Sequence, residues 1–153
     1  MNLTNETILI IDYGSQYTQL IARTIRSLGV YCELHPFDVS DQWIAEFNPK
    51  GIILSGGPRS VTEADSPRAP EQVFKQSCPV LGICYGMHLL IEKLGGKLSS
   101  GAVREYGKST VHYAGGRISG LLQGVPSEHV AWMSHGDSIE TLGDGFEVGG
   151  RTE

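Results

Sequence analysis

The first two-thirds of the chain alternates between short apolar runs and segments compatible with helices. The apolar runs lie at 7–12, 30–34, 51–54 and 79–83. The first of them, at 7–12, is continuous and β-branched, which is typical of a strand buried on both faces of a parallel sheet. Helix-compatible segments lie at 20–28, 40–47, 70–76 and 85–94. This order predicts an α/β fold, an open, mostly parallel sheet with helices on both faces.

The pattern changes after residue 97. Short alternating segments at 109–113, 117–121, 129–133 and 146–149 are separated by turn residues. They predict short antiparallel strands added to the sheet in the C-terminal third of the chain. Because no linker separates the two patterns, the sequence predicts one domain over residues 1–153.

Composition and charge exclude several classes of protein. Lys and Arg total 12 and Asp and Glu total 17, a net charge of −5, which argues against binding to nucleic acid. No apolar run approaches the length of about 18 residues that a membrane span needs. The N-terminus has no secretory signal pattern, so we expect a cytoplasmic protein. The three cysteines have no metal-ligand spacing, so no metal is expected and they are interpreted as free thiols.

Three loops leave the carboxyl ends of predicted strands, where open α/β sheets bind ligands. They span 12–16, 55–60 and 84–87. In the third loop, Gly82-Ile83-Cys84-Tyr85-Gly86 lies between a strand and a helix, which is the context of a nucleophile elbow. The helix N-terminus favours the thiolate of Cys84, so this residue is predicted to be a nucleophile. The alternative is a buried small residue whose glycines only allow close packing.

The second loop, Ser55-Gly56-Gly57-Pro58, suits an oxyanion site. Its glycines leave backbone N–H groups unobstructed, and the Tyr85 N–H after the nucleophile is a second donor for a tetrahedral oxyanion. An ordinary glycine-proline turn is the alternative. A phosphate loop like that of ATP pyrophosphatases is disfavoured, because Arg59 stands where that motif has an acid.

A cysteine nucleophile normally needs a general base. His88 lies four residues after Cys84 on the same predicted helix. Its side chain is expected to point along the helix, whereas an elbow thiol points over the sheet. No histidine of the chain is followed by an orienting carboxylate in a His-x-Glu arrangement, so the catalytic set is expected to be incomplete within these residues.

Four motifs together resemble those of class I glutamine amidotransferases. They lie at 12–23, 55–58, 82–87 and 132–137, and the resemblance covers nearly the whole chain. The first and last motifs are similar to the GMP synthase branch of the family. The resemblance implies hydrolysis of glutamine to glutamate and ammonia through a Cys thioester. It also implies an ATP-pyrophosphatase (synthetase) domain that uses the ammonia to aminate xanthosine 5′-monophosphate to GMP.

The resemblance also implies roles for individual residues. Cys84 is the expected catalytic nucleophile, and the N–H groups of Gly57 and Tyr85 are the expected oxyanion-hole donors. The expected substrate-binding residues are Gly56, His88, Ser134, His135, Gly136 and Asp137. His135 and Asp137 are also similar to residues that face the synthetase domain. No cofactor is expected in this domain. ATP and Mg²⁺ are expected for the synthetase domain, and the full-length protein is expected to be a homodimer.

Two departures from the family pattern affect these expectations. The family usually has Gln four residues after the nucleophile, where this chain has His88. The catalytic histidine and glutamate of the family lie in a His-Pro-Glu motif after the 132–137 segment, and residues 1–153 end before it. We therefore expect the fragment to be inactive alone. A non-catalytic binding or regulatory module on the same scaffold is the alternative.

Overall fold

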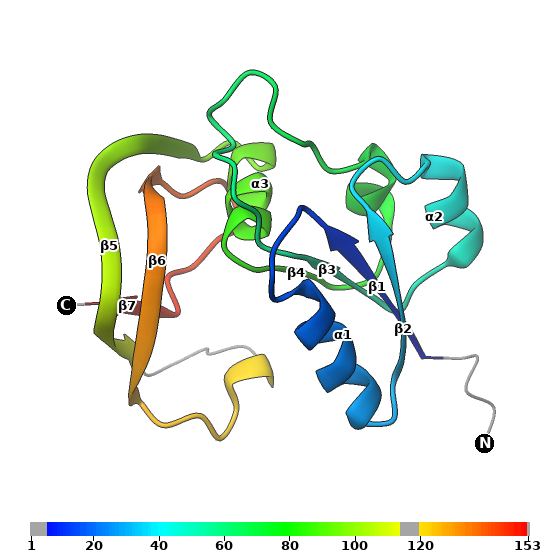
Figure 1. The fold of residues 1–153 in the computed structure, drawn as a ribbon, viewed down its shortest axis with the longest axis horizontal. Helices are drawn as coiled ribbons and strands as arrows, with labels where there is room; N and C mark the ends of the chain where they lie inside the picture. The colour runs from blue at the N-terminus through cyan, green and yellow to red at the C-terminus, as the bar shows by residue number, and fades with distance from the viewer. Residues whose placement is uncertain (1–5, 114–119, 153) are drawn as a thin grey trace. The chain divides into compact units, whose positions relative to one another are not determined.

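The computed structural model describes residues 6–113 and 120–152, and only the backbone of residues 100–105. The chain divides into two compact units, Met1–Lys93 and Leu94–Glu153, which we describe separately (Figure 1). The prediction of one domain over residues 1–153 is not tested by this division and stays a prediction.

The first unit contains a parallel sheet in the order β2-β1-β3-β4. Its strands are β1 (Thr7–Asp12), β2 (Tyr31–Pro36), β3 (Gly51–Leu54) and β4 (Val80–Gly82). Every neighbouring pair in it is parallel. The apolar runs therefore form the parallel sheet that the sequence predicts. The central strand β1 carries fully buried residues, Leu9, Ile10 and Ile11, as expected of a strand covered on both faces.

The helices of the first unit follow the predicted segments. Within its described residues they are α1 (Thr18–Ser27), α2 (Asp41–Phe47), α3 (Tyr85–Lys93) and the 3₁₀ helix η1 (Glu71–Lys75). The α2 helix begins after Ser40 because the Ser40 side chain accepts a hydrogen bond from the Trp43 N–H at 3.2 Å. No helix among the described residues is long and apolar enough to cross a membrane.

Helices cover both faces of the parallel sheet. On one face, Ala22 of α1 and Ile10 of β1 belong to one buried cluster, against which Ile53 of β3 packs. On the other face α3 meets β3, since a Cβ built on Gly86 would lie 2.6 Å from the Leu54 Cβ. Successive residues of a strand point to opposite faces, so Ile53 and Leu54 place α1 and α3 on opposite sides. The predicted fold class is confirmed for this unit.

The second unit contains an antiparallel sheet in the order β6-β5-β7. Its elements are β5 (Lys97–Tyr113), the 3₁₀ helix η2 (Gly120–Leu122), β6 (Glu128–Thr141) and β7 (Gly150–Thr152). The predicted strands at 109–113 and 129–133 lie inside β5 and β6, which are 17 and 14 residues long. These strands are longer than predicted and form their own sheet instead of extending the parallel one.

Long strands are hard to recognise here because the ladder is irregular. Gly107 has φ of +105°, and the pairing of β5 with β6 shifts register between Ser100 and Glu105. Both features break the alternation of apolar and polar residues on which the prediction rests. The antiparallel partners also lie far apart in the sequence, so only the tertiary fold brings them together.

Two of the predicted short strands are wrong at the residues that the structure describes. From the predicted strand 117–121, residues 120 and 121 belong to the 3₁₀ helix η2, and 117–119 lie outside the described residues. Residues 146–149 form no strand, and β7 begins after them at Gly150. The Phe146 N–H instead closes a turn onto the Gly143 carbonyl at 3.4 Å, across Gly145 with φ of +83°. That donor is therefore used locally and does not enter a ladder.

Candidate active site

Cys84 occupies a strained turn between β4 and α3. Its φ is +50°, a left-handed conformation that costs energy for a residue with a side chain. Its side chain is exposed, whereas Cys32 is buried and Cys78 is partly buried. The predicted strand–turn–helix context is confirmed. The nucleophilic role of Cys84 stays a prediction.

The glycines on either side of Cys84 are required by close backbone packing. A Cβ built on Gly82 would lie 2.6 Å from the Gly86 carbonyl oxygen, and one built on Gly86 would lie 2.2 Å from the Leu54 carbonyl oxygen. The turn is tied to the end of β3, because the Ile83 N–H donates to the Leu54 carbonyl at 2.9 Å. These contacts hold the exposed thiol at the carboxyl edge of the parallel sheet.

All three loops at this sheet edge meet beside Cys84. A Cβ built on Gly56 would lie 3.6 Å from the Cys84 Cβ and 3.6 Å from the Ser15 Oγ. Gly57 packs on the first loop so closely that a Cβ would lie 2.7 Å from the Tyr13 carbonyl oxygen. The first loop is itself fastened by Asp12, whose Oδ1 accepts from the Gly14 N–H at 2.9 Å. The three predicted ligand loops therefore form one site.

Two backbone donors at this site are available to a ligand. No acceptor among the described residues of the first unit takes the N–H of Gly57 or of Tyr85. Tyr85 is the first residue of α3, and the N–H groups of a first helical turn have no partner within the helix. Such donors suit a developing oxyanion. The oxyanion-hole roles of Gly57 and Tyr85 stay predictions that this arrangement allows.

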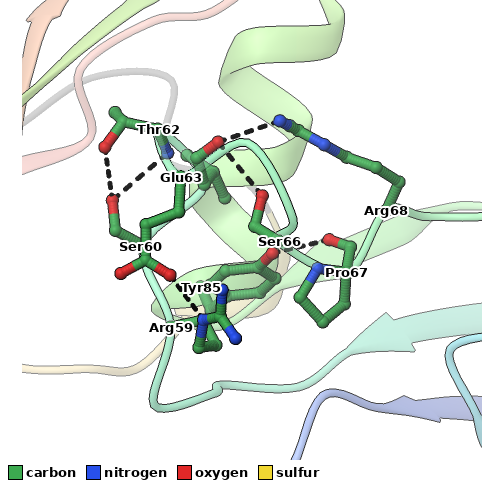
Figure 2. A network of polar contacts seen from close by, with 9 residues as sticks. Arg59, Ser60, Thr62, Glu63, Ser66, Pro67, Arg68 and Tyr85 are labelled. Carbon is green, nitrogen blue, oxygen red and sulfur yellow. Dashed lines mark hydrogen bonds and ion pairs between the residues drawn. The ribbon is translucent and has the colours of Figure 1, made fainter.

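The Tyr85 side chain anchors the loop that follows the Gly56-Gly57 segment. Figure 2 shows its hydroxyl donating to the Pro67 carbonyl, at 2.5 Å. Within the loop, Ser66 and Arg68 both donate to the Val61 carbonyl, at 3.3 and 3.0 Å. Tyr85 is 1% exposed, and burial raises the pKa of its phenol. The hydroxyl therefore stays protonated at neutral pH and can donate this hydrogen bond. This loop is therefore held to the start of α3.

His88 lies one helical turn after Cys84. Its N–H donates to the Cys84 carbonyl at 3.1 Å, and its side chain is only 5% exposed. His35 is held elsewhere, 3.0 Å from a Glu33 carboxylate oxygen and with its ring centroid 3.8 Å from that of Trp43. Contact between His88 and glutamine stays a prediction.

The remaining predicted substrate-binding residues lie on β6 in the second unit. They are Ser134, His135, Gly136 and Asp137. The His135 Nδ1 lies 3.1 Å from the Asp137 carbonyl oxygen, so these two residues are held together locally. Their contact with substrate stays a prediction. Among the described residues, no group of three His, Cys, Asp or Glu side chains is arranged to hold a metal ion.

The sequence predicted no role for the side chains of two residues that lie at the site. Ser15 of the first loop lies against Gly56. Ser55 lies fully buried between the first and third loops, and the Tyr13 N–H donates to its Oγ at 3.0 Å. A polar residue directly at the end of a buried strand was the available signal for Ser55.

Two curated proteins similar to this chain have the same name. A "GMP synthase [glutamine-hydrolyzing]" of Hahella chejuensis is 50% identical over 160 residues, which cover 99% of this chain and 30% of that protein. A protein of the same name from Vibrio vulnificus is 51% identical over 152 residues, which cover 99% of this chain and 29% of that protein. The chain thus spans about 30% of the length of these relatives.

Solved structures show the same fold. A protein of Thermoplasma acidophilum, described as a candidate GMP synthase component, matches with a TM-score of 0.81 and 26% identity, over 96% of this chain and 73% of that one. A glutamine amidotransferase of Thermotoga maritima matches with a TM-score of 0.66 and 18% identity, over 90% of this chain and 63% of that one.

The family model described as "Glutamine amidotransferase class-I" matches residues 9–153. The match includes all three loops at the sheet edge and the β6 segment 132–137. It agrees with the family resemblance that the sequence motifs carry. The chain therefore belongs to the class-I glutamine amidotransferases.

Proposed function

We propose that this chain is the glutamine-hydrolysing part of a GMP-forming enzyme and that Cys84 is its nucleophile. The observation that carries the proposal is the exposed Cys84 thiol, held at φ of +50° at the start of α3 and next to Gly56. A strained elbow of this kind presents a nucleophile beside backbone donors. The relatives named as glutamine-hydrolysing GMP synthases support the substrate.

In the proposed reaction the Cys84 thiolate attacks the side-chain amide carbon of glutamine. The amide oxygen takes the negative charge and is stabilised by the N–H groups of Gly57 and Tyr85. Collapse of this intermediate breaks the C–N bond, and a proton delivered to the nitrogen releases ammonia and leaves a thioester. Water then attacks the thioester carbonyl, which releases glutamate and returns the thiolate.

The proton for the leaving ammonia requires a general acid. The resemblance implies that this is the histidine of a His-Pro-Glu motif, and that tripeptide does not occur in residues 1–153. His88 is the histidine nearest to Cys84 in the sequence, but it is buried. We propose that residues 1–153 bind glutamine and carry the nucleophile, while efficient turnover depends on residues that they do not contain.

The ammonia is proposed to pass to a synthetase region that binds ATP and Mg²⁺ and aminates xanthosine 5′-monophosphate. The substrate-binding residues would be Gly56 and His88 at the elbow, with the 134–137 segment of β6. We propose a cytoplasmic homodimer for the full-length protein. The alternative of a non-catalytic module gains no support from relatives that are named as glutamine-hydrolysing.

The test compares the complete gene product with its Cys84→Ala variant. We expect the variant to release no ammonia from glutamine, but to keep making GMP when ammonium salt replaces glutamine. Cys78→Ala is the matched control, because it removes a partly buried thiol outside the elbow. A Cys84→Ala protein that still hydrolyses glutamine at the wild-type rate would overturn the assignment.

A further inference from the structure

The Ser55 hydroxyl is fully buried between two loops of the site. It accepts a hydrogen bond from the Tyr13 N–H at 3.0 Å and donates one to the Gly56 carbonyl oxygen at 2.9 Å. Ser55 itself is 0% exposed. A hydroxyl has a single proton to donate, and here that proton is directed at the Gly56 carbonyl.

The direction of the Gly56 carbonyl decides where the proposed oxyanion donor points. The Gly56 carbonyl and the Gly57 N–H belong to the same peptide unit, which is planar. In a trans peptide the C=O and N–H bonds point in opposite directions, and the chain has no cis peptide among its described residues. When Ser55 holds the carbonyl toward the buried interior, the Gly57 N–H is therefore directed the opposite way.

The peptide unit between two glycines needs a hydrogen bond of this kind to fix its orientation. Neither Gly56 nor Gly57 has a side chain that restricts its backbone angles, so the peptide unit between them can rotate with little steric resistance. Gly57 cannot be replaced to stiffen it, because a Cβ on Gly57 would lie 2.7 Å from the Tyr13 carbonyl oxygen. A hydrogen bond to the Gly56 carbonyl fixes the peptide without a side chain on Gly57.

The backbone of Ser55 ties this peptide to the elbow. The Ser55 carbonyl accepts from the Gly86 N–H at 3.0 Å, in the first turn of α3. The Ser55 N–H donates to the Ile11 carbonyl of β1 at 3.0 Å. The helix that starts with Tyr85 and the peptide that carries the Gly57 N–H are therefore both fastened to one residue.

We propose that Ser55 is a positioning residue of the glutaminase site, and that its hydroxyl keeps the Gly57 N–H aimed at the oxyanion. This inference rests on the proposed function, because an oxyanion forms only if Cys84 attacks an amide. Ser55 takes no part in proton transfer and needs no contact with glutamine. Its effect is to hold one donor in its catalytic direction before the reaction begins.

Removal of the hydroxyl should lower kcat and leave KM nearly unchanged. The loss of an entire oxyanion-hole donor typically costs about 10²–10³ in kcat. In Ser55→Ala the Gly57 N–H is still present but points away for part of the time, so we expect kcat to fall by about 10- to 100-fold. KM should change by less than about threefold, because the donor acts mainly on the charge that develops in the transition state.

Alkylation of Cys84 separates this role from general damage. Iodoacetamide reacts at a saturated carbon, so its attack by a thiolate creates no oxyanion. In Ser55→Ala the rate of Cys84 alkylation should therefore stay within about twofold of wild type while kcat falls. Ser40→Ala is the control, because it removes another serine hydroxyl that holds a backbone N–H, that of Trp43 at the start of α2. Its kcat should be unchanged.

A pair of matched variants keeps the test valid if Ser55→Ala fails to fold. Thr and Val have the same shape, so Ser55→Thr and Ser55→Val crowd the buried position equally and differ by a hydroxyl. In the complete gene product, Ser55→Thr should have a kcat at least about tenfold above that of Ser55→Val, the lower bound of the loss expected for Ser55→Ala.

Several results would overturn the inference without touching the proposed function. They are a kcat of Ser55→Ala within twofold of wild type, a parallel fall of kcat and alkylation rate, or equal kcat values for the Thr and Val variants. A different result would remove the proposed function itself. In that case the wild-type protein would release no ammonia from glutamine, or Cys84→Ala would release it at the wild-type rate.

Discussion

Gly86→Ala should damage the site although alanine favours helices. Gly86 is the second residue of α3, where the change to alanine contributes about 0.8–1.0 kcal/mol in favour of the helix. The new Cβ would lie 2.2 Å from the Leu54 carbonyl oxygen and 2.6 Å from the Leu54 Cβ. Ordinary contact begins at 3.4 Å, so α3 and β3 must separate by about 1 Å, which is a large shift for a close-packed interior.

This separation destabilises α3 by more than the higher helix propensity of alanine stabilises it. Overpacking of a buried position costs about 1–3 kcal/mol. The hydrogen bond from the Gly86 N–H to the Ser55 carbonyl, 3.0 Å long, lengthens beyond bonding distance, and its loss costs about 1 kcal/mol more. We expect α3 to be destabilised by about 1–3 kcal/mol in total. The shift also moves Cys84 relative to Gly56, and a 1 Å misplacement typically costs about 10² in rate.

Hydrogen exchange and kinetics of the complete gene product test both consequences. Protection of the α3 amides should fall by about 10- to 100-fold in Gly86→Ala, and kcat for glutamine hydrolysis should fall by about 10². Gly29→Ala is the control, since Gly29 has φ of +79° and a Cβ built on it would have no atom within 4 Å. Alanine at this positive φ is strained, so Gly29→Ala should lower the free energy of unfolding and leave kcat unchanged. Increased protection of α3 in Gly86→Ala would show that helix propensity outweighs the contact with Leu54 and refute the reasoning.

Three further predictions concern the thiols, the substrate and the isolated chain. Burial raises the pKa of Cys78, so at pH 7 iodoacetamide should label the exposed Cys84 first. Labelling of Cys78 should rise with pH as its thiolate forms. Peptide mass mapping that finds Cys78 labelled first would contradict this prediction. His88→Gln should tighten glutamine binding by about 1 kcal/mol, seen as a roughly fivefold lower KM, and an unchanged KM would mean that the His88 ring does not contact the substrate. Residues 1–153 alone should release ammonia at least about 10²-fold more slowly than the complete gene product, and equal rates would mean that a histidine within these residues serves as the base.

The sequence was sufficient for the parallel sheet and for the elbow because their signals are local. The strands β1 and β3 carry unbroken runs of apolar residues, and a strand buried on both faces needs no particular partner to be recognised. The Cys84 elbow was equally visible. Gly82 and Gly86 flank the thiol, one two residues before it and one two residues after it, and the segment lies between a strand and a helix, which is the pattern of a nucleophile elbow. The rule that ligand loops leave the carboxyl ends of parallel strands then placed three loops together correctly.

Only the tertiary structure decided the features that depend on partners distant in the sequence. One such feature is the antiparallel ladder with its register shift, which sets the lengths of β5 and β6 and leaves 146–149 without a strand. The stability of such pairing depends on the partner strand, so the sequence of one segment alone does not predict it. The role of Ser55 is similar. Its hydroxyl bonds to Tyr13, 42 residues earlier in the chain, and its carbonyl bonds to Gly86, so its function exists only once β1, β3 and α3 are packed together.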